Sequence, residues 1–423
     1  MRLAPVACAL LLVLAGCGAV TDQASPTPTL TPTADEEPET PSPTPEIDTN
    51  VISAYGSELP FDPTPIFLRV LNMTDERVDA PVVEVEEPGG SSPDIFDRST
   101  SSFRSALGIV PPERTNDSGV QLGAYTPSSG NSVHIYEGAF ENETYARSTL
   151  AHEFVHVVQF REGWGSTVWS RQSGTASSLT HDGRLTYYLV LEGAASYVEQ
   201  QYKQRFLPTA PVLESYGQAA YENASAHSRL NIARYVLGAQ YVDDTVDSPA
   251  DIERVHTEPP VSSEQVLHRN DDPVADLSVD ANDVSSWEAE HERDRQGELF
   301  LRVALRTELN RSAAAAAAHG WGNDVRLTYE RGDATGTAWV LRWDDARNAT
   351  EFEDSFERYL GAKATRQGGV WKQGDGNATY RLQRVSEQNV VVYLGNESFV
   401  RAANATVEAD SRVEVGARNE SAA

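Results

Sequence analysis

The sequence contains very little cysteine and lysine. Both of its cysteines, Cys8 and Cys17, lie near the start of a chain of 423 residues. The rest of the chain therefore forms neither a disulfide framework nor a cysteine-based metal site. The only lysines are Lys203, Lys363 and Lys372, so that almost all positive charge is carried by arginine.

Positive charge is also scarce overall. The chain has 34 basic residues against 63 acidic ones, which gives a net charge of −29. In molar salt the Debye length is about 3 Å, so repulsion between closely spaced surface carboxylates is largely screened. The composition therefore predicts a protein adapted to high salt. An ordinary acidic protein is the alternative. The deficit of basic residues argues against a nucleic-acid partner, because phosphate binding needs a basic face.

Long apolar runs are confined to the first residues. Residues 1–17 begin with Arg2 and continue into an apolar run that is too short to span a bilayer by itself. Leu14-Ala15-Gly16-Cys17 has the form of a lipobox. We expect a lipoprotein signal peptide over 1–17, with a lipidated Cys17 holding the protein at the extracellular face of the membrane. An ordinary signal peptide cut near Ala19 is the alternative.

Residues 18–49 are rich in Pro, Thr, Ser and acids, and such a composition predicts a disordered tether. The folded part is expected to comprise a domain over 50–275 and a second domain over 276–423. Ten Asn-x-Ser/Thr sequons suit a glycosylated surface protein. They are Asn72, Asn116, Asn142, Asn223, Asn310, Asn348, Asn377, Asn396, Asn404 and Asn419.

The start of the first domain predicts mixed elements. Short strands are expected at 66–71 and 82–85, and a helix at 101–107. The segments 120–125 and 133–136, separated by the turn-like 127–131, predict a β hairpin. The edge of this hairpin is suited to holding an extended peptide by strand addition, and a purely structural sheet edge is the alternative.

A metal-binding pattern follows in His152-Glu153-Phe154-Val155-His156. Two histidines four residues apart on a helix project from one face, so both imidazoles can reach one zinc ion. Glu153 is then placed as a general base toward water. The helix is expected over 144–160 with Thr144 as its cap. The alternative is a pair of histidines on an ordinary amphipathic helix.

The third zinc ligand is expected on the next helix. Residues 164–184 are polar and rich in small side chains, which predicts a loop near the mouth of the site that can serve as a lid. His181 is expected to be a solvated loop residue, with a metal ligand as the alternative. A helix over 185–204 carries Glu192, and the small residues at 193–195 allow it to pack closely on the metal helix. Two histidines and one glutamate leave a fourth position open, as catalysis requires. Glu199, two turns later, is predicted to support a ligand.

The HExxH motif at 152–156 followed by Leu191-Glu192-Gly193-Ala194-Ala195 resembles the gluzincin metallopeptidases, in particular their aminopeptidase branch. The resemblance implies that His152, His156 and Glu192 bind zinc and that Glu153 is the catalytic base. Tyr235-x-x-Gly238 matches a segment whose tyrosine stabilises the oxyanion in that branch. A helix-packing tyrosine is the alternative.

The sequence also departs from that branch. The spacing from His156 to Glu192 is about twice as long as is usual there, and the Gly-x-Met-Glu-Asn segment that captures a free amino terminus is missing. An endopeptidase or a diverged enzyme therefore fits better than an aminopeptidase.

Residues 276–423 predict an α+β domain. Helices are expected within 293–319 and at 347–360, and strands at 325–329, 338–343, 379–385 and 389–394. The chain as a whole resembles uncharacterised HExxH surface lipoproteins of halophilic archaea, which implies an α+β protein with a zincin-like domain. The expected function is a lipid-anchored zinc metallopeptidase acting on peptides or proteins. A non-catalytic zinc protein and a tethered adhesion module are the alternatives.

Overall fold

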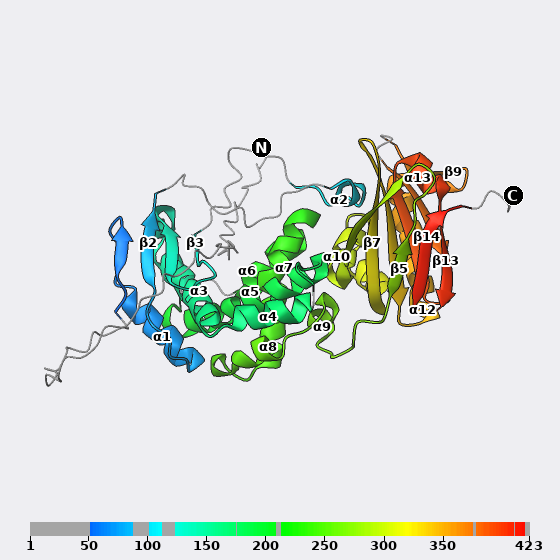
Figure 1. The fold of residues 1–423 in the computed structure, drawn as a ribbon. Coiled ribbons are helices and arrows are strands. Elements are labelled where there is room, and N and C mark those ends of the chain that lie inside the picture. Colours follow the sequence, from blue (N-terminus) through cyan, green and yellow to red (C-terminus); the bar gives the residue numbers. More distant parts are fainter. Residues whose placement is uncertain are drawn as a thin grey trace, which may run out of the picture.

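The computed structural model describes residues 51–87, 101–111, 123–174, 176–208, 213–374, 378–409 and 411–418. The signal peptide and tether expected over 1–49, Cys17, and the sequons Asn116, Asn377 and Asn419 lie outside these ranges. The described chain is a mixed α+β structure, as the sequence predicts. Figure 1 shows a small sheet at one end, helices in the middle and larger sheets at the other end.

The small sheet has the strand order β1-β2-β4-β3, with β1 (Ala54–Gly56), β2 (Val82–Glu86) and β4 (Ser132–Tyr136) parallel. The edge strand β3 (Ala124–Tyr125) is antiparallel to β4, which confirms the predicted hairpin in its described part. The strand expected at 66–71 is wrong, because these residues lie in the helix α1 (Thr64–Thr74). Its buried residues Ile66, Phe67, Val70 and Leu71 recur at helical spacing. Six residues are too few to distinguish this pattern from that of a buried strand.

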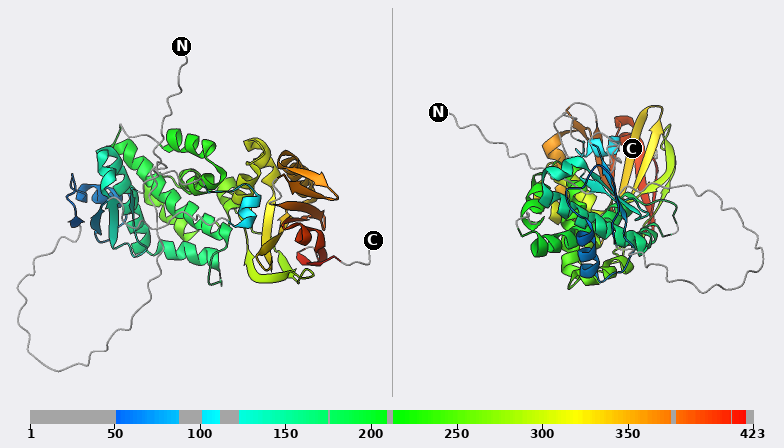
Figure 2. Two further views of the ribbon diagram at one scale, coloured as in Figure 1. Left: turned by 90° about the horizontal axis from the view of Figure 1, so that it is seen from above. Right: turned by 90° about the vertical axis from the view of Figure 1, so that its left-hand side faces the viewer.

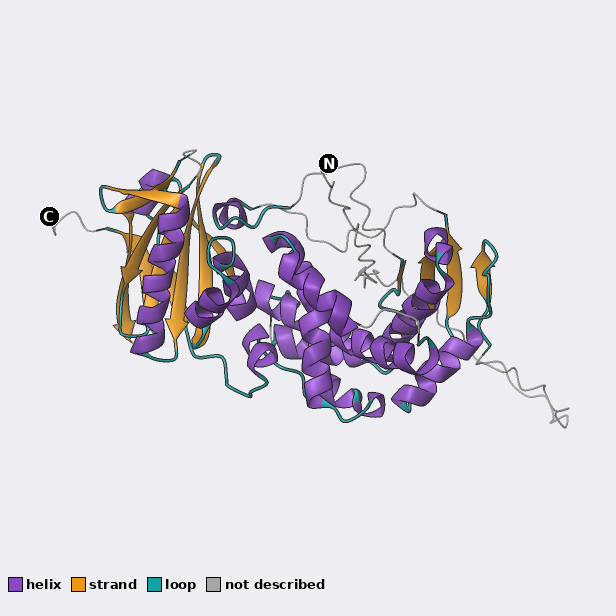
Figure 3. Ribbon diagram, turned by 180° about the vertical axis from the view of Figure 1, so that it is seen from behind, coloured by secondary structure: helices purple, strands orange, loops and turns teal. Residues whose placement is uncertain are grey.

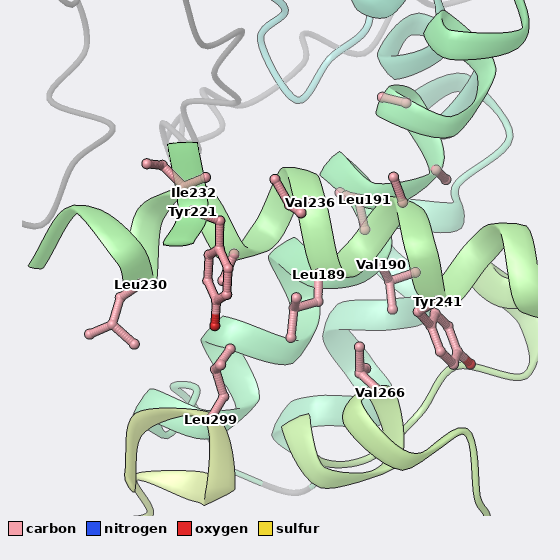
Figure 4. Packing of buried hydrophobic residues seen from close by; sticks show 14 of the residues in the cluster. Leu189, Val190, Leu191, Tyr221, Leu230, Ile232, Val236, Tyr241, Val266 and Leu299 are labelled. Atoms are coloured by element: carbon pink, nitrogen blue, oxygen red, sulfur yellow. The ribbon is translucent and has the colours of Figure 1, made fainter. Parts of the chain in front are cut away.

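The middle layer is helical. It comprises α3 (Glu143–Arg161), α4 (Trp164–Ser173), α5 (His181–Phe206), α6 (Leu213–Asn223), α7 (Ala226–Thr245), α8 (Glu253–Thr257) and α9 (Ser263–His268), with short 3-10 turns at Glu137–Glu141 and Pro249–Asp251. The central helix α5 contacts α3, α4, α7, α8 and α9, and in addition α1 and α10. Figure 4 shows the apolar side chains that fill the space between α5, α7 and α9.

The loop expected over 164–184 is confirmed only at residues 174 and 176–180, because 164–173 and 181–184 are helical. The left-handed Gly163 turns the chain directly from α3 into α4, where buried Trp164 and Val168 lie one turn apart. His181 is the first residue of α5 and is buried, so it is not a solvated loop residue. Most polar residues of 164–173 lie on the outer face of α4, and composition alone did not separate that pattern from a loop.

Of the small residues expected to lie against the metal helix, Gly193 faces α7 instead. A Cβ built on Gly193 would lie 2.5 Å from the carbonyl carbon of Gly238, and one on Gly238 would lie 2.3 Å from the carbonyl oxygen of Leu189. The close backbone approach at Gly193 is therefore between α5 and α7, while α5 contacts α3 as well. Gly238 of the Tyr-x-x-Gly pattern accordingly has a packing reason to be glycine.

The C-terminal part contains a seven-stranded antiparallel sheet in the order β6-β7-β8-β12-β11-β10-β9 and a three-stranded sheet in the order β13-β14-β5. Its strands are β5 (Ser278–Ala281), β6 (Glu288–Asp294), β7 (Trp321–Arg331), β8 (Ala334–Trp343), β9 (Ala364–Gln367), β10 (Val370–Gln373), β11 (Thr379–Arg384), β12 (Asn389–Gly395), β13 (Ala403–Ala409) and β14 (Arg412–Ala417). Its helices are α10 (Gly297–Leu305), α11 (Arg311–Ala318), α12 (Ala346–Lys363) and α13 (Glu397–Ala402).

A separate hydrophobic core lies between the two C-terminal sheets, and it contains Trp287, Tyr329 and Phe399. The helix α12 contacts β8 and β12, and its Phe352 and Tyr359 belong to the main core instead. Figures 2 and 3 show this sheet-rich end from other directions, with the helices between it and the small sheet.

The N-terminal part also reaches this C-terminal end. The helix α2 (Ser102–Ala106) was expected at 101–107, and its Phe103 ring lies on Phe300 at 5.6 Å and on Trp339 at 5.5 Å. The carbonyl of Ala106 accepts hydrogen bonds from Tyr380 and Lys363. Since a helix ends in carbonyl groups without internal partners, these donors cap it.

The start of α5 is held by the same junction. The buried Asp182 carboxylate accepts hydrogen bonds from the backbone of Ser263 at 3.1 Å and from Arg295 at 3.1 Å. The helix that carries Glu192 is thus tied to α9 and to the segment before α10. Among the described helices, none combines the length and apolarity that crossing a membrane would need.

Candidate metal centre

The helix α3 presents His152, Glu153 and His156 in the interior of the protein, and all three side chains are buried. It begins after Asn142, whose side chain accepts a hydrogen bond from the backbone N–H of Tyr145 at 3.1 Å. The expected cap at Thr144 is therefore wrong, and the helix starts one residue earlier than predicted. Asn142 is the better cap because its carbonyl reaches the free N–H groups of the first turn.

The helix α5 brings Glu192 to the two histidines. The Nε2 atoms of His152 and His156 are 3.2 Å apart, and Glu192 Oε2 lies 3.3 Å from the first and 3.4 Å from the second. These three buried side chains form a group whose ligand atoms can hold one metal ion. The sequence prediction that Glu192 joins the HExxH pair is consistent with this arrangement.

The spacing of the three atoms suits a small tetrahedral cation. For metal–ligand bonds of about 2.0–2.1 Å, neighbouring ligands of a tetrahedron are separated by about 3.3–3.4 Å. The observed separations of 3.2, 3.3 and 3.4 Å agree with that edge. In addition, Glu192 Oε1 and Glu153 Oε1 are buried and have no hydrogen-bond partner among the described residues. The donor set and its geometry therefore fit a zinc ion.

Glu199 lies behind His152, as predicted. Its Oε2 atom is 3.3 Å from His152 Nδ1, and its other oxygen is 3.0 Å from Lys203 Nζ, one turn further along α5. An imidazole whose Nδ1–H faces a carboxylate keeps its Nε2 lone pair for a metal. Lys203, one of three lysines in the chain, balances the charge of that carboxylate.

The charges of the site are strongly coupled. Burial opposes protonation of His152, but the carboxylates of Glu192 and Glu199 outweigh burial and raise the pKa of His152 to about 10. Burial acts to raise the pKa of Glu192, but the two histidines outweigh it and hold that pKa at about 2. The pocket thus favours positive charge between its histidines and Glu192, which either a proton or a metal cation can supply.

Glu153 points one carboxylate oxygen at Thr126, a residue that the sequence did not single out. Thr126 Oγ1 donates to Glu153 Oε2 at 2.7 Å, and Thr126 directly follows the edge strand β3. Burial raises the pKa of Glu153. A buried carboxylate with a raised pKa and one oxygen without a partner is suited to exchanging a proton. A threonine after a short hairpin strand carries no recognisable sequence signal.

Two tyrosines lie close to this group. The Tyr235 ring on α7 is buried, and its centre is 6.2 Å from that of His152, so the predicted residue does lie beside the site. Tyr145 lies two turns before His152 on α3, and its hydroxyl is buried. The seven-residue spacing from Tyr145 to His152 was a signal that sequence reasoning missed.

Two further histidines lie away from this group. His181 Nδ1 is 3.3 Å from the Gln296 carbonyl oxygen, and His268 Nε2 is 2.9 Å from Glu298, so both serve the C-terminal junction. The remaining sequons lie on described elements or their ends. Of these, Asn72, Asn142, Asn223, Asn310 and Asn396 are exposed, whereas Asn348 and Asn404 are half-buried.

Comparison with known proteins identifies only the C-terminal part. A family model described as Domain of unknown function (DUF8575) matches residues 284–407. This stretch spans the seven-stranded sheet and does not include His152, His156 or Glu192. Neither a curated protein nor a solved structure matches the chain.

Proposed function

We propose that this protein is a zinc-dependent metallopeptidase of the gluzincin type, with a zincin-like fold around α3, α5 and the small sheet. The observation that carries the proposal is the set of three ligand separations of 3.2, 3.3 and 3.4 Å between His152, His156 and Glu192. Two imidazoles and one carboxylate in this geometry leave a fourth tetrahedral position, which distinguishes catalytic zinc sites from closed structural ones.

The protein's own residues supply the proton transfer. A bound zinc ion supplies Lewis acidity toward a peptide carbonyl and toward water. Glu153, held through Oε2 by Thr126, takes a proton at Oε1 and later returns it to the leaving amine. Tyr235 is the proposed donor to the developing oxyanion, because its ring lies beside His152.

The edge of the small sheet supports a peptide as the substrate. β3 is the outermost strand and is followed directly by Thr126, which contacts the proposed base. An extended peptide that adds to this edge through main-chain hydrogen bonds would run past Glu153. The combination of a strand edge and a buried carboxylate favours cleavage within an extended chain, and it places no requirement on a free amino terminus.

The test compares wild type with Glu153→Gln, which preserves the size of the side chain and removes the base. Both proteins are expected to bind one zinc ion, while cleavage of a peptide library in molar salt falls by about 10²-fold or more in the variant. Glu143→Gln, on the exposed first turn of the same helix, is the matched control and should cleave normally.

Two outcomes would contradict the proposal. A wild-type protein with stoichiometric zinc that cleaves no peptide would leave a non-catalytic zinc-binding surface protein. Unchanged cleavage by Glu153→Gln would exclude Glu153 as the base.

We further propose that the protein is attached by a lipid on Cys17 to the extracellular face of the membrane. The support is the lipobox Leu14-Ala15-Gly16-Cys17 and the Pro/Thr/Ser-rich segment after it. Cys17→Ser should release the protein from the membrane fraction, and Cys8→Ser, the matched control, should not. Membrane retention of Cys17→Ser would contradict lipid attachment at this residue.

A further inference from the structure

A chain of hydrogen bonds continues from the second histidine into the helices around it. His156 Nδ1 is 2.7 Å from Gln159 Oε1, one turn later on α3. Gln159 Nε2 lies 2.9 Å from the carbonyl oxygen of Leu191 and 3.1 Å from His256 Nε2. His256 Nδ1 in turn is 2.7 Å from the carbonyl oxygen of Ile252. All three side chains of this chain are fully buried.

The direction of each hydrogen bond follows from chemistry. The carbonyl of Ile252 can only accept, so His256 carries its proton on Nδ1. Burial lowers the pKa of His256 to about 4, so that its Nε2 is a lone pair at neutral pH. Gln159 therefore donates from Nε2 to His256 as well as to Leu191.

The amide of Gln159 is oriented by both of these acceptors. Its Oε1 must then accept from His156 Nδ1–H, and the other ring nitrogen of His156 is left with a lone pair. That nitrogen, Nε2, is the atom that faces Glu192 and His152.

The same chain connects the two helices that carry the ligands. Leu191 directly precedes Glu192 on α5, and Gln159 lies on α3 with His156. His256 reaches them from α8, and its ring stacks on Trp164 of α4 at a distance of 4.8 Å between ring centres. The side-chain amide of Gln159 therefore connects His156, the backbone beside Glu192 and His256 of α8 to one another.

We propose that Gln159 and His256 are positioning residues for the metal centre, which hold His156 in the tautomer and orientation that direct Nε2 at the metal. The inference rests on the proposed metal site and adds two residues that bind neither metal nor substrate. The structure thus gives each histidine its own support: Glu199 with Lys203 behind His152, and Gln159 with His256 behind His156. Because the second support is neutral, the charge of the ligand set is left unchanged.

The experiment measures the affinity of the full chain for zinc alone, by competition with a chelator, and the absorption spectrum with cobalt alone. Gln159→Met is expected to lower zinc affinity by about 10–100-fold, as removal of such partners does. His256→Phe keeps the stack on Trp164 but removes the acceptor, so it is expected to lower affinity by a smaller factor. His256→Gln, which offers an amide oxygen in place of Nε2, should stay within about threefold of wild type.

The ranking of zinc affinities, with His256→Gln above His256→Phe, distinguishes a positioning role of His256 from a packing role. If His256 only fills an apolar space beside Trp164, phenylalanine should replace it better than glutamine. Wild-type affinity and an unchanged cobalt spectrum in a folded His256→Phe protein would overturn the proposal. Gln265→Met and His181→Phe are matched controls, since both residues are buried and bonded elsewhere, and both variants should bind zinc normally.

A measurement on the wild-type protein avoids any folding defect of the variants. A long-range ¹H–¹⁵N spectrum of histidine-labelled protein should show neutral His256 with its proton on Nδ1, with the signal assigned by its absence in His256→Gln. A proton on Nε2 would overturn the proposal. The tautomer of His256 can be measured without metal. A failure of the wild type to bind zinc would contradict the proposed function, and it is therefore distinguishable from a failure of the positioning proposal.

Discussion

The contact between Gly193 and Gly238 makes a prediction that joins packing to the metal centre. In Gly193→Ala the new Cβ would lie 2.5 to 2.7 Å from the backbone of Gly238, whereas ordinary contacts begin near 3.4 Å. The conflict is with backbone, which cannot rotate away, so α5 and α7 must separate by roughly 1 Å. Glu192 is the residue next to Gly193 and moves with it.

The expected magnitude follows from two opposing terms. Alanine favours a helix over glycine by about 1 kcal/mol. Overpacking a tightly packed contact costs about 1–3 kcal/mol, and more where backbone must move. Because backbone must move here, the cost lies in the upper part of that range, about 2–3 kcal/mol. The net destabilisation is then on the order of 1–2 kcal/mol, or a Tm lowered by roughly 2–8 °C for a domain of this size. Zinc affinity should fall as well, because Glu192 Oε2 shifts relative to the two imidazoles.

Gly361→Ala is the matched control. Gly361 lies in α12, and a Cβ on it would meet no atom within 4 Å, so only the helix preference remains. Calorimetry should show Gly361→Ala at or above the wild-type Tm with unchanged zinc affinity. A Gly193→Ala protein with wild-type Tm and wild-type zinc affinity would refute the argument that this crossing positions Glu192.

Three further predictions concern single side chains. Glu192→Ala should lose stoichiometric zinc when metal content is measured by mass spectrometry; retained zinc would contradict its assignment as a ligand. Thr126→Val removes a hydrogen bond that lowers the pKa of Glu153, so the acid limb of the cleavage rate should move to higher pH, and an unmoved limb would argue against Glu153 as the base. Burial, reinforced by Glu298, raises the pKa of Glu264 from 4.5 to about 8. The folded protein therefore holds a proton that the unfolded chain releases, and stability should fall as pH rises from about 4.5 to 8. Glu264→Gln, which stays neutral, should show a smaller fall in Tm between pH 5 and pH 8.5; an unchanged fall would assign it to other groups.

Regular, strongly patterned elements were predictable from the sequence. The hairpin strands β11 and β12 carry alternating or continuous apolar residues between turn signals, and both were expected within about a residue of their bounds. The helix α12 was expected over 347–360 and spans Ala346–Lys363. By contrast, α1 was taken for a strand and α4 for a loop, because a short apolar run or a polar composition fits more than one structure.

Some residues of the candidate site were predictable from the sequence, and others were not. His152, Glu153 and His156 are recognisable because the spacing of four residues alone places both imidazoles on one helix face. Glu192 was placed by a second short motif on the next helix. Thr126, Gln159 and His256 were not singled out, since each contributes through a contact that depends on how separate elements pack.

The sequence by itself determined the local chemistry: a paired imidazole helix, a nearby carboxylate helix and an α+β composition. These features follow from the spacing of residues over a few turns of helix or strand, which can be read without knowing which elements pack together. Only the tertiary structure decided that Gly193 faces Gly238, that α2 docks on the C-terminal sheet and that His256 of α8 stands behind Gln159. The physical reason is that burial and hydrogen bonding act between residues that are close in space, and the order of residues along the chain does not specify those pairs.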